Sequence, residues 1–166
     1  MQVVSPKLKH IFGIQSLSLV KGDGDWYSLI LHSKVVHTFL KNVIKIPDGR
    51  KKGKLIIPQL VRQNSELTGA FLRGLFDTDG GISKVSSTKP ALSLSQADDR
   101  FLGEVKKMLI KLGISLGGPY KSGSHRGHEL KSYNIKTIKK FQHELGFRHP
   151  VKKQRLLYWM NSIDMT

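Results

Sequence analysis

The sequence has no cysteine in its 166 residues. That absence excludes disulfides, thiolate nucleophiles and zinc sites with sulfur ligands. The sequence also has no apolar run of the roughly 18 to 20 residues that would span a bilayer. Its first residues carry no long apolar stretch after a basic region, so we expect no secretory signal and a cytoplasmic or organellar location.

Acidic residues are also few. The chain has 12 Asp and Glu against 28 Lys and Arg, which gives a formal net charge of +16 at pH 7. The positive electrostatic field of such a protein attracts polyanions and speeds its encounter with them, so nucleic acid is the expected partner. Charge alone leaves open a ribosomal or chromatin-like protein that neutralises phosphate without further chemistry.

The first 60 residues are predicted to form a separate N-terminal part. Residues 12–19 and 26–31 are rich in β-branched, aromatic and aliphatic types around a Gly-Asp turn, which indicates a β-hairpin. Ser33 then precedes a short helix whose expected apolar face consists of Val35, Val36, Phe39 and Leu40. A basic loop follows. This layout resembles that of residues 122–145, so we interpret the N-terminal part as a partial repeat.

Residues 61–166 are predicted to form an α+β core. Strict alternation of apolar residues indicates strands with one buried face, and helical spacing indicates amphipathic helices. The predicted elements are a helix from Asn64 or Ser65 to the glycines at 80 and 81, strands over 82–87 and 91–96, a helix over 98–112, strands over 118–121 and 129–135, a helix over about 137–145, and a helix opened by Pro150. The last helix is expected to bury Leu156, Leu157, Trp159 and Met160.

The helix that precedes Gly80 carries a small residue at every fourth position, namely Ala70, Gly74 and Thr78. Such a stripe lets two helix backbones approach closely, and together with Phe71 it is the predicted contact between two copies of the helix. The helix ends on Asp79, whose negative charge lies at the unfavourable end of the helix dipole. A bound cation would remove that conflict.

The segment from Leu72 to Gly80 reads Leu-Arg-Gly-Leu-Phe-Asp-Thr-Asp-Gly. It resembles the motif that names the LAGLIDADG homing endonucleases, of the single-motif, intron-encoded type. Residues 56–58 before the motif and residues 145–153 after it are similar to the family's repeat as well. Arg73 departs from the motif, where a small residue is usual, and we expect its side chain to point away from the helix contact or to splay it.

The resemblance implies an αββαββα repeat whose antiparallel strands form a DNA-binding saddle, with the N-terminal hairpin and helix as an extension. It implies Asp79 and Gly80 as ligands of a divalent metal, Mg²⁺ or Mn²⁺. Gln96 and Lys152 are the implied catalytic partners of Asp79, with Lys153 as the alternative to Lys152. The implied reaction is hydrolysis of both strands of a specific DNA site to leave short 3′ overhangs, with no small-molecule cofactor and no membrane.

The same resemblance implies that alternate strand positions and turns of the repeat bind DNA. Arg and Lys would contact guanine edges or phosphates there, and Ser would be permissive. The residues expected at this surface are Ser83, Lys84, Ser86, Ser93, Ser95, Arg100, Lys121, Ser124, His125, Arg126, Lys131 and Tyr133.

A single motif per chain predicts a homodimer and a near-palindromic target. Residues 19–24 faintly resemble a first motif, which would make the chain a two-motif monomer. They lie too close to Asp79 for a complete intervening repeat, however, and they fit a hairpin turn. The alternative functions on the same scaffold are an RNA maturase and a DNA-binding protein that does not cleave.

Overall fold

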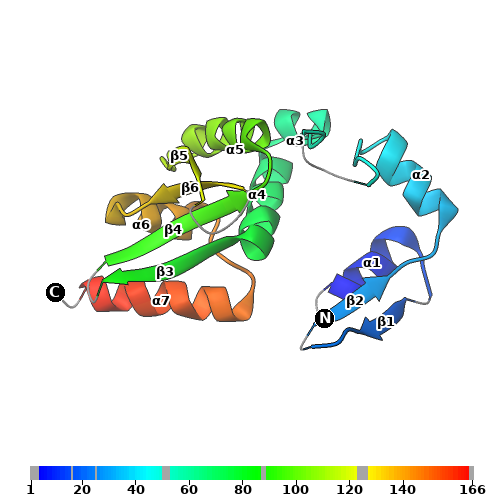
Figure 1. Cartoon of the computed structure of the whole chain (residues 1–166), viewed down its shortest axis with the longest axis horizontal. Coiled ribbons are helices and arrows are strands. Elements are labelled where there is room, and N and C mark those ends of the chain that lie inside the picture. The colour runs from blue at the N-terminus through cyan, green and yellow to red at the C-terminus, as the bar shows by residue number, and fades with distance from the viewer. Residues whose placement is uncertain are drawn as a thin grey trace. The chain divides into compact units, whose positions relative to one another are not determined.

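The computed structural model describes residues 4–15, 17–24, 26–49, 53–86, 89–122 and 127–164. The chain forms two compact units, residues 1–48 and 49–166 (Figure 1). Residues 49–60, which the sequence patterns place with the N-terminal part, belong to the larger unit. None of the helices in the described ranges is both long and apolar enough to span a membrane.

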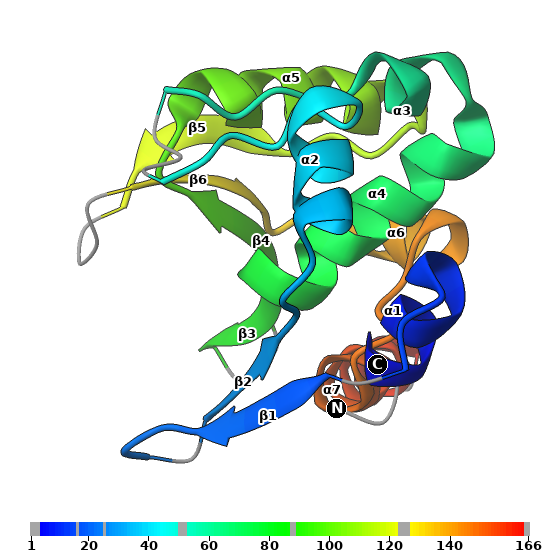
Figure 2. The same ribbon diagram turned by 90° about the vertical axis from the view of Figure 1, so that its right-hand side faces the viewer.

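The smaller unit contains α1 (Val4–Phe12), β1 (Ser18–Lys21), β2 (Tyr27–Ile30) and α2 (Lys34–Asn42). β1 and β2, drawn in blue in Figure 2, pair antiparallel, which confirms the predicted hairpin. The first strand begins at Ser18 because residues 4–12 form a helix that was not predicted. Pro6 fits the first turn of this helix, and apolar residues recur at helical spacing at Leu8, Ile11 and Phe12.

Ser33 caps α2 as predicted. Its hydroxyl oxygen accepts a hydrogen bond from the backbone N–H of Val36 at 3.2 Å. The predicted apolar face is only partly buried, because Val35 and Phe39 are 79% and 42% exposed while Val36 is buried. Residues 19–21 lie in β1 rather than in a helix, so this segment does not form a first signature helix.

The larger unit contains α3 (Gln59–Gln63), α4 (Ser65–Asp79), β3 (Gly80–Ser86), β4 (Lys89–Gln96), α5 (Asp99–Lys111), β5 (Gly117–Lys121), β6 (His128–Ser132), α6 (Ile135–Glu144) and α7 (Pro150–Asp164). The strands form one sheet in the order β3-β4-β6-β5, and all neighbouring strands are antiparallel. From α4 to α6 the elements follow the predicted αββαββα order. The short helix α3 was not predicted.

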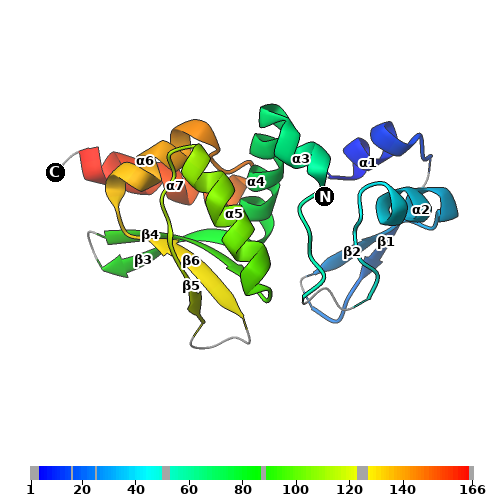
Figure 3. The same cartoon turned by 90° about the horizontal axis from the view of Figure 1, so that it is seen from above.

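One face of the sheet packs against helices. Leu92 and Leu94 of β4 and Leu130 of β6 are fully buried in a core shared with helices of the unit. In Figure 3, α6 and α7 lie above β3 and β4. Because side chains alternate along a strand, Ser93 and Ser95 point to the opposite face, which is called the open face below.

Asparagine caps set the starts of two helices. The Oδ1 atom of Asn64 accepts a hydrogen bond from the N–H of Leu67 at 2.9 Å, and α4 begins directly after this residue as predicted. The Oδ1 atom of Asn134 accepts from the N–H of Lys136 at 2.9 Å. This cap starts α6 at Ile135 rather than at about residue 137.

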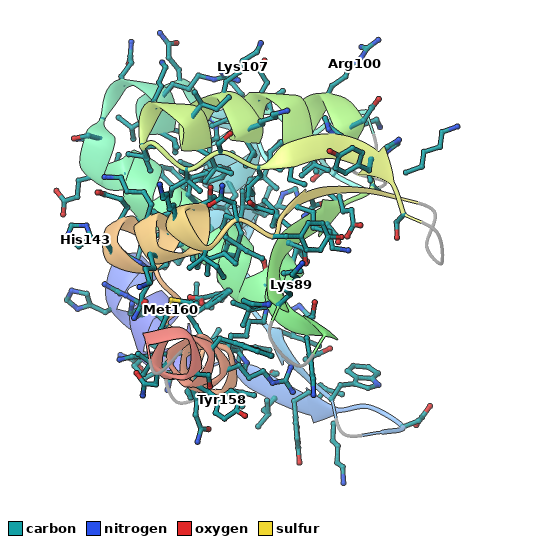
Figure 4. The ribbon with its side chains drawn as sticks, turned by 90° about the vertical axis from the view of Figure 1, so that its left-hand side faces the viewer. Lys89, Arg100, Lys107, His143, Tyr158 and Met160 are labelled. Atoms are coloured by element: carbon teal, nitrogen blue, oxygen red, sulfur yellow. The ribbon has the colours of Figure 1, made fainter. Side chains whose placement is uncertain are left out.

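The last helix, α7, begins at Pro150 as predicted. Leu156, Trp159 and Met160 are buried, but Leu157 is 41% exposed, so the predicted burial of Leu157 is wrong. The three buried residues recur at helical spacing and form one stripe, and Leu157 lies beside that stripe. Figure 4 shows Met160 on the side of α7 toward α6 and Tyr158 on the other side.

Candidate active site

Asp79 is the last residue of α4, and Gly80 begins β3 directly after it. This helix-to-strand junction, visible in Figure 2, has no connecting loop. A Cβ atom at position 80 would lie 2.5 Å from the Phe76 side chain and 2.8 Å from the Phe76 backbone. Glycine therefore permits the tight corner, and the corner leaves the Asp79 side chain exposed.

Gln96 lies at the end of β4 and contacts Asp79. Its Nε2 atom donates a hydrogen bond to Asp79 Oδ2 at 2.5 Å. The Oγ1 atom of Thr78 lies 3.2 Å from the same oxygen. The structure thus brings together two of the three residues that the family resemblance implies as catalytic.

The Asp79 carboxylate fits one ligand of a hard divalent cation. Both donors that contact it among the described residues bind Oδ2, so Oδ1 remains as an acceptor. Mg²⁺ is commonly bound through one or two carboxylates, with water and phosphate oxygens completing its shell. Within the described ranges no group of three or more His, Cys, Asp or Glu side chains gathers, so this fit concerns one carboxylate. Gly80 lies opposite Leu94 in the ladder between β3 and β4.

Lys152 of α7 binds the C-terminal end of α4. Its Nζ atom donates to the carbonyl oxygens of Phe76 at 3.1 Å, Asp77 at 2.7 Å and Thr78 at 3.0 Å. An ammonium group at this end of a helix satisfies free carbonyls and complements the dipole. Burial lowers the pKa of Lys152, and the charges of Asp77 and Asp79 oppose that shift. Lys152 therefore lies close to Asp79, with its three N–H groups engaged by the helix.

Asp77 makes the matching contact in the other direction. Its Oδ1 atom accepts hydrogen bonds from the backbone N–H groups of Arg148 at 2.9 Å and His149 at 3.0 Å. These residues directly precede α7, so a carboxylate satisfies N–H groups near its N-terminal end. The sequence patterns offered no signal for this contact, because Asp77 reads as an ordinary residue of a polar turn.

The small-residue stripe of α4 is exposed at Ala70, Gly74 and Thr78. A Cβ atom added at Gly74 would meet nothing within 4 Å. Arg73 points away from this stripe, since its Nε atom donates to the Leu145 carbonyl at the end of α6 at 2.7 Å.

Phe71, which was also predicted to lie in the helix contact, is half-buried in the chain's own core. Its ring lies 6.4 Å from the ring of Phe101 in an edge-on arrangement. The exposed part of the predicted helix contact is therefore the narrow line of small residues, with Phe71 at its border.

A shallow pocket of about 300 Å³ adjoins Asp79 and Gln96, and its other lining residues are Ser95, Ala97, Ser122, Gly127 and His128. His128 lies opposite Gln96 where β4 pairs with β6. Its Nδ1 atom is buried and has no hydrogen-bond partner within the described part of the chain. No sequence motif marks His128, because its place beside Gln96 depends on strand register.

The residues predicted to contact DNA fall into different places. Ser93, Ser95 and Lys131 lie at positions of the open face, and Ser83 joins them because it pairs with Ala91 in the same alternation. Lys84 and Lys121 are exposed, but they lie opposite Pro90 and His128, so alternation places them on the other face of the sheet. Tyr133 is exposed just after the end of β6. Arg100 lies on α5, and Figure 4 shows it pointing outward from that helix. Ser124, His125, Arg126 and the side chain of Ser86 lie outside the described residues.

Residues 66–146 match the family model described as a LAGLIDADG-like domain. The homing endonuclease I-ApeI of Aeropyrum pernix is 27% identical over 158 residues, which covers 93% of this chain and 70% of that protein. A glutamine–fructose-6-phosphate aminotransferase of Methanocaldococcus jannaschii is 26% identical over 161 residues, but the match spans 93% of this chain and only 14% of the aminotransferase. A DNA polymerase of Thermococcus litoralis is 30% identical over 158 residues, with 91% of this chain and 9% of the polymerase covered.

Solved structures of the homing endonuclease I-DmoI have a similar fold. The structure of I-DmoI with DNA and Mn has a TM-score of 0.63 at 20% identity, covering 87% of this chain and 72% of that chain. A structure of mesophilic I-DmoI variants has a TM-score of 0.65 at 19% identity, covering 93% and 73%. The chain therefore has the fold of the LAGLIDADG homing endonucleases, and its residues 66–146 match a LAGLIDADG-like domain.

Proposed function

We propose that this chain is a site-specific homing endonuclease that hydrolyses both strands of double-stranded DNA and leaves short 3′ overhangs. The contact between Gln96 and Asp79 at the exposed end of α4 carries the proposal. It holds a carboxylate at a helix end that disfavours negative charge, beside a pocket and an open sheet face. In a chain of net charge +16 that attracts phosphates, such a carboxylate would suit a divalent cation.

Asp79 and Gly80 are the proposed ligands of Mg²⁺ or Mn²⁺. A divalent ion bound there would supply an activated water and stabilise the leaving oxygen. Gln96 orients the Asp79 carboxylate through Oδ2 and so leaves Oδ1 for the ion. Lys152 places a positive charge behind Asp79, and the exposed Lys153 is the alternative residue for contact with the scissile phosphate.

The open face of the sheet is the proposed DNA-binding surface. Its central positions carry Ser93, Ser95 and Lys131, whose side chains can form hydrogen bonds with bases or phosphates. Lys84 and Lys121 lie near the strand ends at positions of the other face, so they are proposed only as contacts to the phosphate backbone at the edges of the sheet.

A homodimer is the proposed active form. One chain delivers one Asp79, and the exposed line of Ala70, Gly74 and Thr78 lets a second copy of α4 approach closely. Two-fold symmetry would bring two Asp79 carboxylates to one centre and match a near-palindromic DNA site.

The first test is cleavage of a randomised double-stranded DNA library in the presence of Mg²⁺. We expect cleavage at a specific sequence, and we expect Asp79→Asn to lower the rate by roughly 100-fold or more while DNA binding survives. Asp99→Asn, on the exposed start of α5, is the matched control and should leave cleavage unchanged. Specific binding without cleavage under any divalent metal would favour the non-cleaving or maturase alternatives instead.

The dimer has a separate test. Sedimentation of the protein on its cleaved target should give a protein mass of twice 18.7 kDa. A protein component of a single 18.7 kDa chain in an active complex would contradict the homodimer.

A further inference from the structure

A single carboxylate side chain stands among the central open-face residues of the described sheet. Glu129 and Lys131 lie on β6, one of the two central strands, on either side of the fully buried Leu130. Alternation therefore points both side chains to the open face. Glu129 lies opposite Ser95, and Lys131 lies opposite Ser93.

Glu129 and Lys131 form an ion pair, with Lys131 Nζ and Glu129 Oε1 3.2 Å apart. The Lys131 side chain is only 26% exposed and the Glu129 side chain only 24%. Lys131 Nζ also lies 5.7 Å from the centre of the Tyr133 ring. Burial lowers the pKa of Lys131, but the hydrogen bond and charge of Glu129 outweigh this effect and raise the pKa. The pair is therefore a fixed donor beside a fixed acceptor.

A carboxylate is an unfavourable group for contact with the DNA backbone, because it repels phosphates. Base edges, unlike phosphates, can bind a carboxylate. Cytosine presents an N4–H donor in the major groove, and Glu can accept a hydrogen bond from it. Guanine presents two acceptors beside that donor, N7 and O6, which lysine can contact. A donor and an acceptor side by side thus match the two halves of one G·C pair.

We propose that Glu129 and Lys131 together read one G·C base pair in each half of the DNA target. This inference rests on the proposed DNA-binding function of the open face. Lys131 gives one N–H to Glu129 Oε1 and keeps two for guanine O6 and N7. Glu129 Oε2 accepts from cytosine N4–H, so the protein pair runs parallel to the hydrogen bond inside the base pair.

The same geometry ranks the other base pairs. An A·T or C·G pair in this orientation would place an amino donor against the Lys131 ammonium and an acceptor against the Glu129 carboxylate, so both are rejected. A T·A pair offers one acceptor and one donor in the right order but replaces guanine N7 with a methyl group. The expected order is G·C first, T·A second, and A·T and C·G last.

The test is selection of bound sequences from randomised DNA without divalent metal, using the full chain and two variants. Wild type should prefer G·C at one position per half-site. Glu129→Gln and Lys131→Gln should each reduce the preference for G·C over A·T at that position by roughly tenfold, with other positions unchanged. Glu144→Gln is the control, because it removes the same charge and an equivalent ion pair to Lys140 on α6.

The outcomes separate this inference from the proposed function. Wild-type protein that selects no sequence at all contradicts specific DNA binding by this chain. If wild type selects a specific target and both folded variants select the same sequence profile, the inference that this pair reads a base pair is overturned. Specific DNA binding by the chain would still stand. Thermal unfolding verifies that the variants are folded.

Discussion

Asp77 and Lys152 join the end of α4 to the start of α7 by two opposite contacts. The carboxylate binds N–H groups ahead of α7, and the ammonium binds the last carbonyls of α4. Each charge lies at the helix end that favours it. Asp79 follows two residues after Asp77, so this double contact sets where the metal-binding candidate stands.

Lys152→Met should lower the free energy of unfolding by about 1–2 kcal/mol, because it removes a charged donor from three carbonyl groups. Lys153→Met, at an exposed neighbour, should change it by no more than about 0.5 kcal/mol. Urea denaturation of both variants measures the difference. Equal effects would show that the contacts of Lys152 do not stabilise the fold.

Glu104 of α5 provides a pH-dependent link to α3. Hydrogen bonds from Lys107 and Arg62, each 2.7 Å long, hold the pKa of Glu104 at about 2, below the ordinary value of 4.5. A depressed carboxyl pKa stabilises the fold above pH 4.5, and the contribution disappears as the pH falls toward 2.

We therefore expect the melting temperature of wild type to exceed that of Glu104→Gln at neutral pH. The gap should close between pH 4.5 and about pH 2, and added salt should narrow it because the pair is exposed. Calorimetry across this range tests the sign. A gap that stays constant with pH would exclude Glu104 as its source.

At the scale of elements, α4 separates its roles by face. Leu72 and Phe76 are fully buried, and Lys152 and the Gly80 corner hold the end of the helix. Gly74 lies on a face that the described residues of its own unit leave open. Glycine within a helix interior lowers helix stability by roughly 0.5–1 kcal/mol relative to alanine. Its presence at Gly74 has no packing reason among the described residues of the larger unit, which supports a contact with a second α4.

Gly74→Leu should leave the single chain folded or slightly more stable, because position 74 is exposed and a Cβ atom there meets nothing within 4 Å. The leucine side chain would separate two α4 helices and so remove their close packing. Cleavage should therefore fall by roughly tenfold or more. Gly103→Leu on α5, which is equally free of neighbours, serves as the control. Unfolding curves and cleavage rates of the two variants test the proposed contact between α4 helices. Full activity of Gly74→Leu would contradict it.

Sequence patterns predicted the elements with long, regular periodicity and missed those that are short. The helix α3 spans five residues, too few to show a period, and α1 ends in residues that also suit a strand. Gln96 was placed beside Asp79 through the family resemblance. Asp77, His128 and Glu129 were not identified, because their partners depend on strand register or lie far along the chain.

At the scale of the whole molecule, the charge of +16 exceeds what one catalytic site requires. Lysines and arginines that neutralise phosphates release counterions, so affinity for any DNA should fall steeply with salt. Raising salt from 50 to 200 mM should weaken binding by roughly 10³-fold if six or more phosphates are contacted. Asp79→Asn should keep the same slope in a fluorescence-anisotropy titration; a flat response would argue against a backbone-wide contact.

The unpaired face of α4 also has a kinetic meaning. If each chain carries half of a reaction centre, then below the dissociation constant of the pair the number of complete centres grows with the square of the chain concentration. Halving the amount of protein would then reduce DNA breakage fourfold. A nuclease built in this way has very little activity at low protein concentration. The dependence of its cleavage rate on protein concentration then reports how tightly two α4 helices associate.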